Sequence, residues 1–182
     1  MDIVAVLVTA FWAMLPAYVP NNAAVLTGGG PPIDGGRTWN GERILGDGKT
    51  WRGTVGGIAA GALLALLMNA AHPTLQGLLA VDLPAPFPPA VVLALPTGAL
   101  LGDITASFLK RRTGRERGAA FPGLDQLDFV VLALVLTAIA DWGWFTATFT
   151  LEVLATVLVI TPLLHVSTNV IAYKLSLKSE PW

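Results

Sequence analysis

Long apolar stretches separated by short polar segments make up most of this chain of 182 residues. About five of these stretches come near the roughly 20 apolar residues that an α-helix needs to cross a bilayer. They cover residues 3–19, 54–71, 90–109, 127–145 and 149–173. Residues 74–89 are also apolar, but prolines break the pattern, and we expect them to lie at the membrane interface. The pattern therefore predicts an all-α integral membrane protein with a single domain over residues 1–182.

Composition supports a lipid environment. Hydrophobic residues make up 54% of the chain, charged residues only 13%, and the mean hydropathy is +0.65. Soluble domains are usually about 25% charged, so this chain has too few ionic groups to cover a water-facing surface. The absence of cysteine excludes disulfides and thiolate metal sites. Residues 1–19 contain no Lys or Arg, so we expect a retained first span and not a cleaved signal peptide.

The placement of the basic residues predicts the orientation of the chain. With about five spans, the segments after the first, third and fifth stretches share one side of the membrane. The positive-inside rule makes that side cytoplasmic, with the N-terminus outside and the C-terminus inside. All basic residues lie in these segments: Arg37, Arg43, Lys49 and Arg52, then Lys110, Arg111, Arg112, Arg115 and Arg117, then Lys174 and Lys178.

The first cytoplasmic loop, residues 20–53, is rich in glycine and ends in GDGKTWRG at residues 46–53. Glycine permits close backbone approach to a ligand, and N–H groups at such turns and at a helix N-terminus bind phosphate. The segment is not a P-loop, because Arg43 stands where that motif requires glycine and no strand precedes it. Spacing alone leaves phosphate binding and a flexible linker equally open. The candidate phosphate-binding residues are Asp47, Gly48, Lys49, Thr50, Arg52 and Gly53.

Carboxylates flank a cluster of cations in the second cytoplasmic loop. Asp103 lies within the third span, where an acid is expensive and is by default a functional candidate; a lysine or arginine partner for it is the alternative. Asp125 and Asp128 are three residues apart, on one face of the fourth span. Carboxylates bind Mg²⁺, whereas Lys and Arg bind phosphate, so together they suit reactions at phosphorus. The remaining candidates are Ser107, Lys110, Arg111 and Arg112, although such a basic run can also contact anionic lipid.

Two further patterns are interpreted as packing. Gly53, Gly57 and Gly61 are four residues apart and form a small-residue face that lets another backbone approach closely. The polar stripe around His165 in the fifth span is likewise assigned to helix packing. His72 lies on the outer side in the predicted orientation, and it is therefore a weak catalytic candidate.

The two loops together resemble the CDP-archaeol synthase family, the archaeal branch of the CTP-dependent phosphatidate cytidylyltransferases. In the first loop the resemblance is carried by Pro20-Asn21, Gly28-Gly29, Asp34-Gly35-Gly36 and residues 44–53. In the second it is carried by a serine, a Lys-Arg pair, a basic stretch, a Pro-Gly turn and two aspartates: Ser107, Lys110-Arg111, Arg115 to Arg117, Pro122-Gly123, Asp125 and Asp128. The histidine and the Lys-Asp pair of the bacterial signature are absent, which favours the archaeal, ether-lipid branch.

The resemblance implies the substrates, the cofactor and the roles of the residues. CTP and 2,3-bis-O-(geranylgeranyl)-sn-glycerol 1-phosphate would give CDP-archaeol and pyrophosphate at the cytoplasmic face of the cell membrane. The cofactor would be Mg²⁺, and no nucleic acid is expected as a partner. The implied metal ligands are Asp103, Asp125 and Asp128, which are also implied as catalytic with Lys110 and Arg111. The implied nucleotide-binding residues are Asn21, Asn22, Asp47, Gly48, Lys49, Thr50, Arg52, Gly53, Ser107 and Arg112.

Three other functions compete with this interpretation. A CDP-alcohol phosphotransferase would carry a D-G-x2-A-R motif, which is absent. A CTP-dependent polyprenol kinase would share the substrate classes but release CDP instead of pyrophosphate. A small membrane transporter would distribute polar groups through the bilayer midplane, whereas most charge here is predicted on one side.

Overall fold

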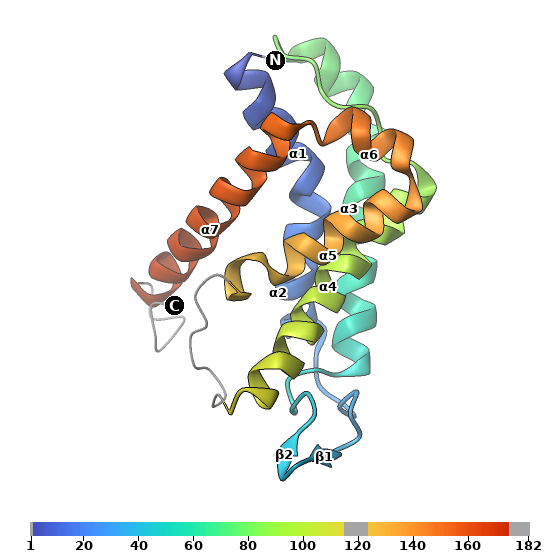
Figure 1. Ribbon diagram of the computed structural model, residues 1–182. Helices are drawn as coiled ribbons and strands as arrows, with labels where there is room; N and C mark the ends of the chain where they lie inside the picture. Colours follow the sequence, from blue (N-terminus) through green and yellow to red (C-terminus); the bar gives the residue numbers. More distant parts are fainter. Residues whose placement is uncertain (1, 115–123, 175–182) are drawn as a thin grey trace.

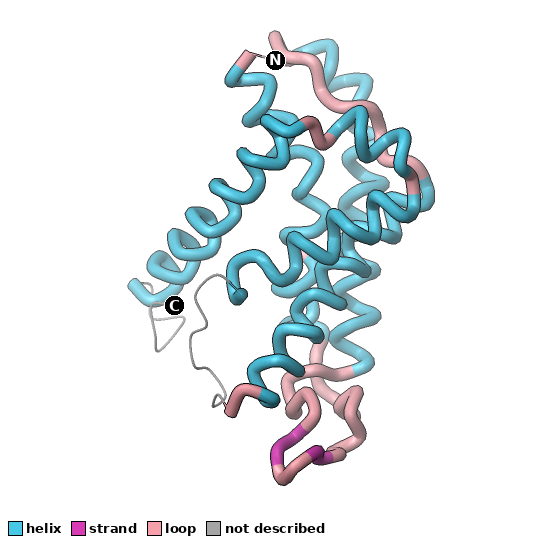
Figure 2. Tube along the Cα trace, viewed as in Figure 1, coloured by secondary structure: helices cyan, strands magenta, loops and turns pink. Residues whose placement is uncertain are grey.

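The computed structural model describes residues 2–114 and 124–174, and most of them are helical (Figures 1 and 2). The helices α1, α3 and α4 run along the long axis of the molecule, and α5 crosses them obliquely. The start of α1 lies at the top of the view, and α7 slopes away from the bundle and ends near mid-height (Figure 1). The predicted residues Arg115, Arg117 and Lys178 lie outside the described ranges. The all-α prediction is confirmed for the described chain, apart from one short hairpin.

The first helical segment is longer than its apolar pattern. α1 (Ile3–Tyr18) is followed after a single residue by α2 (Pro20–Thr27), and together they form a candidate span of 25 residues. Proline is tolerated at the first position of a helix because no N–H is needed there, so Pro20 starts α2. Residues 20–27 are therefore helical, and the prediction that the first polar loop begins at residue 20 was wrong.

α3 (Trp51–Leu78) and α4 (Pro89–Arg112) are the next long apolar helices. α3 extends past its predicted end and includes Pro73, so only residues 79–88 of the predicted interfacial segment form an irregular link. Large apolar side chains of α3 remain exposed on its outer face, among them Val55, Leu63 and Leu67. Apolar surface of this kind suits contact with lipid and not with water.

The predicted fourth span, residues 127–145, is interrupted. α5 (Leu124–Ala140) ends early, and the Asp141 carboxylate accepts a hydrogen bond from the Trp144 N–H at 2.9 Å, which starts the new helix α6 (Trp142–Thr148). α6 meets α7 (Leu151–Lys174) at a bend of 77°. By length and composition the described chain has three candidate spans, or four if α6 and α7 count as one, and α5 is a shorter apolar helix. The prediction of about five spans is not confirmed.

Glycines in two helices let the bundle pack closely. A Cβ on Gly57 or Gly61 would lie 2.6 Å from the carbonyl oxygens of Pro20 and Pro16, so α3 can lie against the first helical segment only with glycine at these positions. The predicted packing role of the glycine face in α3 is thus confirmed. Gly102 performs the same function in α4, because its Cβ would lie 2.3 Å from the Asp128 carbonyl oxygen of α5. The core between these helices includes fully buried apolar side chains: Met14, Val91, Leu95, Val130, Val153 and Val157.

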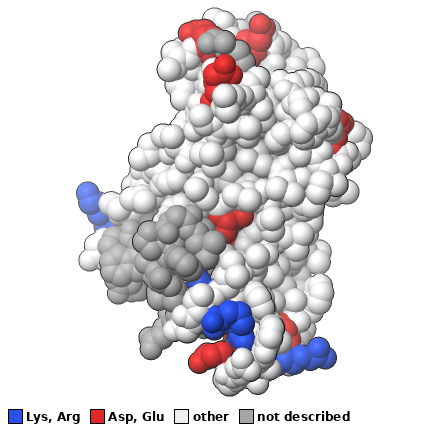
Figure 3. Space-filling view, in the orientation of Figure 1, with Lys and Arg blue, Asp and Glu red and all other residues white. Residues whose placement is uncertain are grey.

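The residues between α2 and α3, which we call the glycine-rich loop (28–50), form a compact cap on one end of the bundle. Its centre is a hairpin of β1 (Thr38–Trp39) and β2 (Glu42–Arg43), paired antiparallel. We call this end of the molecule the hairpin end (Figure 1). On the face seen in Figure 3, Lys and Arg gather toward the hairpin end and also appear at mid-height on the left edge, whereas Asp and Glu occur at both ends and in between. This distribution agrees with the one-sided placement of positive charge that the sequence predicted.

Candidate active site

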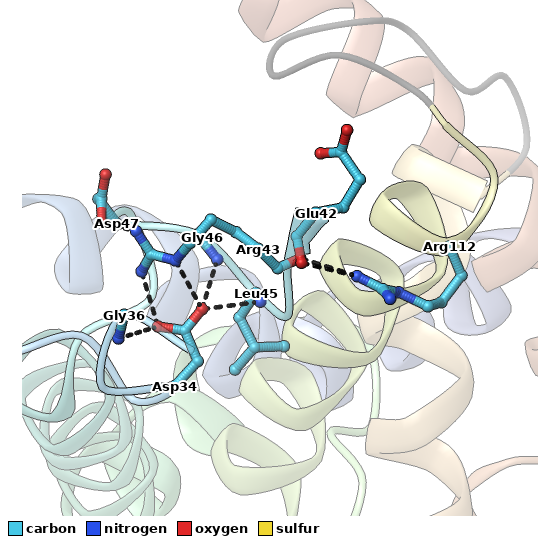
Figure 4. A network of polar contacts seen from close by, with 8 residues as sticks. All are labelled: Asp34, Gly36, Glu42, Arg43, Leu45, Gly46, Asp47 and Arg112. Atoms are coloured by element: carbon cyan, nitrogen blue, oxygen red, sulfur yellow. Dashed lines mark hydrogen bonds and ion pairs between the residues drawn. The ribbon is translucent and has the colours of Figure 1, made fainter. Parts of the chain in front are cut away.

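A buried carboxylate organises the glycine-rich loop (Figure 4). Asp34 is only 7% exposed, and its two oxygens accept hydrogen bonds from the Arg43 guanidinium at 2.7 and 3.3 Å. They also accept from the backbone N–H groups of Gly36, Leu45 and Gly46, at 3.0–3.1 Å. The Asp34 side chain therefore ties together parts of the glycine-rich loop that are up to 12 residues apart in the sequence. The loop has a defined structure, so the alternative that it is a flexible linker does not hold.

The charge on Asp34 is maintained by these contacts. The hydrogen bonds from Arg43 hold the pKa of Asp34 well below its usual range, against the effect of burial, and the three backbone N–H groups lower it further. The same interaction raises the pKa of Arg43, with a smaller contribution from Asp47. Asp47, a predicted nucleotide-binding residue, is mostly exposed and bonds to Arg43 at 2.5 Å. Its exposed neighbour Gly48 completes the turn that leads to Lys49.

Three predicted nucleotide-binding residues have structural contacts at the start of α3. The Thr50 hydroxyl accepts a hydrogen bond from the Gly53 N–H at 3.1 Å and so caps the helix. Gly53 also lies against α2, because a Cβ there would be 2.8 Å from the Ala24 carbonyl oxygen. The Nε of Arg52 donates to the Thr27 carbonyl at 2.8 Å. These contacts explain the residues without a ligand, and their predicted binding role stays a prediction.

An ion pair joins the two polar segments that the sequence singled out. Lys49, from the glycine-rich loop, contacts the Asp103 carboxylate of α4, 54 residues further along the chain. The side chains are 24% and 30% exposed, so both remain partly accessible. The Ile33 N–H donates to the Lys49 carbonyl at 2.8 Å and fixes the backbone of this residue. The sequence left open that Asp103 pairs with a lysine or arginine, and the structure shows that it pairs with Lys49.

The close packing of α4 and α5 brings two of the predicted acids near each other. Asp103 directly follows Gly102, whose missing Cβ makes room for the backbone of Asp128. One Asp128 oxygen accepts a hydrogen bond from the Phe129 N–H at 2.6 Å. The side chain of the third predicted acid, Asp125, lies outside the described residues. Asp103 and Asp128 therefore come from neighbouring turns of two helices that are held together by a glycine.

The predicted asparagines are on α2 and not in a loop. Pro20 and Leu100 both contact the position of a Cβ on Gly57, which places the start of α2 about one turn above Asp103 along α4. The side-chain oxygen of Asn21 is buried and has no hydrogen-bond partner among the described residues. Asn22 is exposed. A buried acceptor without a donor is rare in proteins, so Asn21 is the better candidate for contact with a ligand.

The last two turns of α4 carry the remaining candidates. The Ser107 hydroxyl donates to the Asp103 carbonyl at 2.9 Å, a bond within its own helix. Lys110 and Arg111 are half-buried, and the Arg111 guanidinium lies about 3.9 Å from where a Cβ on Gly46 would be. Arg112 instead bonds to backbone carbonyls of the hairpin. α4 therefore contacts the glycine-rich loop through Asp103, Arg111 and Arg112.

The residues present are chemically suited to Mg²⁺. No group of three or more His, Asp or Glu side chains within the described ranges is arranged to hold a metal ion, but Asp125 lies outside this comparison. Proteins usually bind Mg²⁺ through one or two carboxylates together with substrate phosphates. Asp103 and Asp128 would supply two carboxylates, and the Asn21 oxygen, which has no partner among the described residues, is of the hard type that Mg²⁺ prefers. The magnesium assignment stays a prediction.

Sequence reasoning missed Asp34 and Arg43 as the centre of the loop, and it missed Gly102. The Asp-Gly-Gly sequence at residues 34–36 is typical of a turn in which the aspartate accepts a bond two residues on. That signal could have indicated Asp34. Gly98 and Gly102 have the same spacing of four residues as the glycines of α3, so the packing rule applied there also covers α4.

A helical bundle with an apolar outer face and a polar cap, in which Lys49 of the cap meets the Asp103 carboxylate of the bundle, indicates a multi-pass membrane protein with a polar site at one end. Comparison with known proteins identifies the family. The family model described as "CarS-like: CDP-archaeol synthase" matches residues 3–182, and the chain belongs to this family. It is accordingly a CTP-dependent cytidylyltransferase of lipid biosynthesis.

The relatives match over nearly the whole chain. The CDP-archaeol synthase of Halobacterium salinarum (strain ATCC 29341 / DSM 671 / R1) is 64% identical, and that of Haloarcula marismortui is 65% identical; both alignments cover 100% of each chain. A solved structure described as an intramembrane enzyme for archaeal membrane lipids biosynthesis is similar with a TM-score of 0.70 and 39% identity. That match covers 88% of this chain and 92% of the other. The resemblance identified from the two loops is confirmed.

Proposed function

We propose that this enzyme transfers the cytidylyl group of CTP to 2,3-bis-O-(geranylgeranyl)-sn-glycerol 1-phosphate, giving CDP-archaeol and pyrophosphate. The family supports CDP-archaeol formation, and the ion pair between Lys49 and Asp103 carries the assignment of the site. It joins a glycine-rich loop suited to phosphate with an acid suited to a metal–phosphate complex. CTP would bind at this junction, on the side of the bundle that carries the hairpin.

The nucleotide would be held by cations and by backbone groups. In the proposed complex, Lys49 and Arg111 contact the β- and γ-phosphates, where negative charge develops on the leaving pyrophosphate. The Arg52 guanidinium uses its Nε for Thr27, and its other N–H groups have no partner among the described residues, so they can reach a phosphate. Asn21, at the start of α2, supplies a buried acceptor that has no partner among the described residues. Asp47 and Gly48 shape the exposed turn in front of Lys49.

The chemistry needs no general base. The nucleophile is an oxygen of the lipid phosphate, which is already anionic near neutral pH, and it attacks the α-phosphorus of CTP. A bond from the lipid oxygen to this phosphorus forms while the bond to the bridging oxygen of pyrophosphate breaks. Histidine is thus unnecessary, in agreement with the position of His72, which bonds to a backbone carbonyl in the link between α3 and α4. The enzyme's task is to bring two polyanions together.

Asp103 and Asp128, with Asp125, would hold Mg²⁺, which when bound neutralises charge on the phosphates. In the substrate-free enzyme Lys49 neutralises Asp103. The carboxylate is thereby held at the site without an uncompensated charge. The isoprenoid chains would stay in the bilayer, against the apolar outer faces of the helices, while the phosphate reaches the cytoplasmic side.

A product assay tests this function. Purified protein in detergent is mixed with Mg²⁺, the geranylgeranyl ether glycerol phosphate and CTP labelled on its α-phosphate. We expect the label in the lipid fraction and release of pyrophosphate. Asp103→Asn should lose this activity, whereas Glu42→Gln, an exposed acid of the hairpin, should retain it. Production of CDP instead would show a polyprenol-type kinase, and unreacted CTP would contradict the proposal.

A further inference from the structure

Arg112, the last residue of α4, is bound almost entirely by the β-hairpin. Its Nη1 donates to the Trp39 carbonyl at 2.7 Å, and its Nη2 donates to the carbonyls of Glu42 and Arg43 at 3.3 and 3.0 Å. Its guanidinium carbon lies 5.2 Å from the centre of the Trp39 ring and 5.6 Å from that of Phe108. Figure 4 shows the side chain reaching from α4 to the backbone of the hairpin.

These contacts do not resemble a phosphate site. The partners of the guanidinium are neutral carbonyl oxygens and aromatic rings, and its Nε is buried without a partner among the described residues. The two terminal nitrogens carry four N–H groups, and three hydrogen bonds to the hairpin already use most of them, so little of the guanidinium is left for a phosphate. Arginine suits the observed role because its planar fork can reach several acceptors at once, whereas lysine acts as a point charge.

The hairpin leads directly to the proposed nucleotide site. Its last residue, Arg43, binds Asp34, and Asp34 in turn holds the N–H groups of Leu45 and Gly46. Three residues further on, Lys49 meets Asp103 on the same helix that carries Arg112. α4 therefore holds the glycine-rich loop at two levels, about two and a half helical turns apart.

We propose that Arg112 is a positioning residue that fastens the hairpin to the end of α4 and so sets where Lys49 stands against Asp103. In this proposal Arg112 does not touch the nucleotide. The positioning role therefore replaces the nucleotide-binding role that the family resemblance implied for it. The inference rests on the proposed function in one respect, the participation of Lys49 in CTP binding. The docking of the hairpin itself can be measured without any substrate.

Hydrogen–deuterium exchange of the substrate-free, full-length protein in detergent tests the docking. In Arg112→Ala we expect amides of residues 36–47 to exchange about tenfold faster or more, because three hydrogen bonds to the hairpin are lost. In Arg112→Lys the same amides should exchange nearly as fast as in Arg112→Ala, because an ammonium group cannot make the forked contacts of a guanidinium. Arg37→Gln is the matched control: it removes one positive charge from an exposed side chain of the same loop and should leave exchange unchanged.

Kinetics then separate positioning from phosphate contact. Arg112→Ala should raise the KM for CTP about tenfold with a smaller change in kcat, and Trp39→Ala should produce part of the same increase. Both substitutions weaken the same contact, that between Arg112 and Trp39. In the variant that carries both, the increase in KM should therefore be smaller than the sum of the two separate effects. Trp39 has no charge, so its effect cannot come from a lost phosphate contact.

Two results would overturn the proposal. One is wild-type exchange in Arg112→Ala together with a raised KM, which would make Arg112 a phosphate ligand. The other is recovery of wild-type exchange and KM in Arg112→Lys. Absence of cytidylyl transfer by the wild-type protein would instead overturn the proposed function, and the exchange measurement would still decide whether Arg112 docks the hairpin.

Discussion

A single methyl group on Gly102 should separate the two acids of the proposed site. In Gly102→Ala the new Cβ would lie 2.3 Å from the Asp128 carbonyl oxygen and 2.6 Å from the Phe129 Cα. Both are backbone atoms, so no side-chain rotation can relieve the contact. To reach 3.0 Å, the lower limit of normal Cβ contacts, the gap between α4 and α5 must widen by about 0.7 Å at this point. Asp128 would then move away from Asp103.

The expected effects follow from this displacement. Overpacking of a helix interface typically destabilises by about 1–3 kcal/mol, so the melting temperature in detergent should fall. Misplacement of reacting groups by about 1 Å can reduce a rate about 100-fold, so kcat for cytidylyl transfer should fall about 10- to 100-fold. The assay compares kcat per folded protein, after size-exclusion chromatography, with that of the wild type.

Gly77→Ala is the matched control for this substitution. Gly77 lies near the end of α3, where a Cβ would meet nothing within 4 Å, and alanine is the better helix former. This variant should keep its activity and melt at the same or a higher temperature. Wild-type kcat and stability in Gly102→Ala would refute the inference that the spacing of α4 and α5 sets the site.

Three further results are expected. Asp128→Asn should abolish cytidylyl transfer while the protein remains folded and inserted, as judged by its elution volume; normal turnover would contradict the metal assignment. Lys49→Gln should raise the KM for CTP and leave the lipid KM nearly unchanged, because its charge is assigned to the nucleotide; equal changes in both would contradict this role. The depressed pKa of Asp34 means that its stabilising effect on the loop is fully present above about pH 4, its pKa when unfolded, and is lost only as pH falls through the lower folded value. Amide protection in residues 36–46, corrected for intrinsic exchange, should therefore stay constant from about pH 8 to about pH 5; a loss of protection in that interval would show that Arg43 does not hold the Asp34 charge.

Several features were accessible from the sequence because they depend on short-range rules. The low charge content and the apolar stretches indicated a helical membrane protein, and the extent of α4 was close to the prediction. The spacing of Gly57 and Gly61 correctly indicated a close helix contact. The loop motifs identified the family, because the resemblance depends on residue types at fixed spacing along the chain.

Other predictions failed at helix ends, where the residues nearby favour different boundaries. The apolar run at residues 127–145 gave no sign that Asp141 would end α5 and cap a new helix. A run of apolar residues suits both a straight and a broken helix, and the local cap decides between them. Residues 20–27 looked like the start of a loop, but Pro20 can begin a helix as readily as it can end one.

The sequence by itself determined the environment, the helical class and the set of chemically competent residues, because composition and motif spacing carry that information directly. Only the tertiary structure decided which of those residues meet. It paired Lys49 with Asp103 across 54 positions, placed Asp128 against Gly102, and turned Arg112 toward the hairpin. The physical reason is that long-range contacts depend on how closely two helices can approach, and that distance is set by a few small residues whose partners lie on another helix.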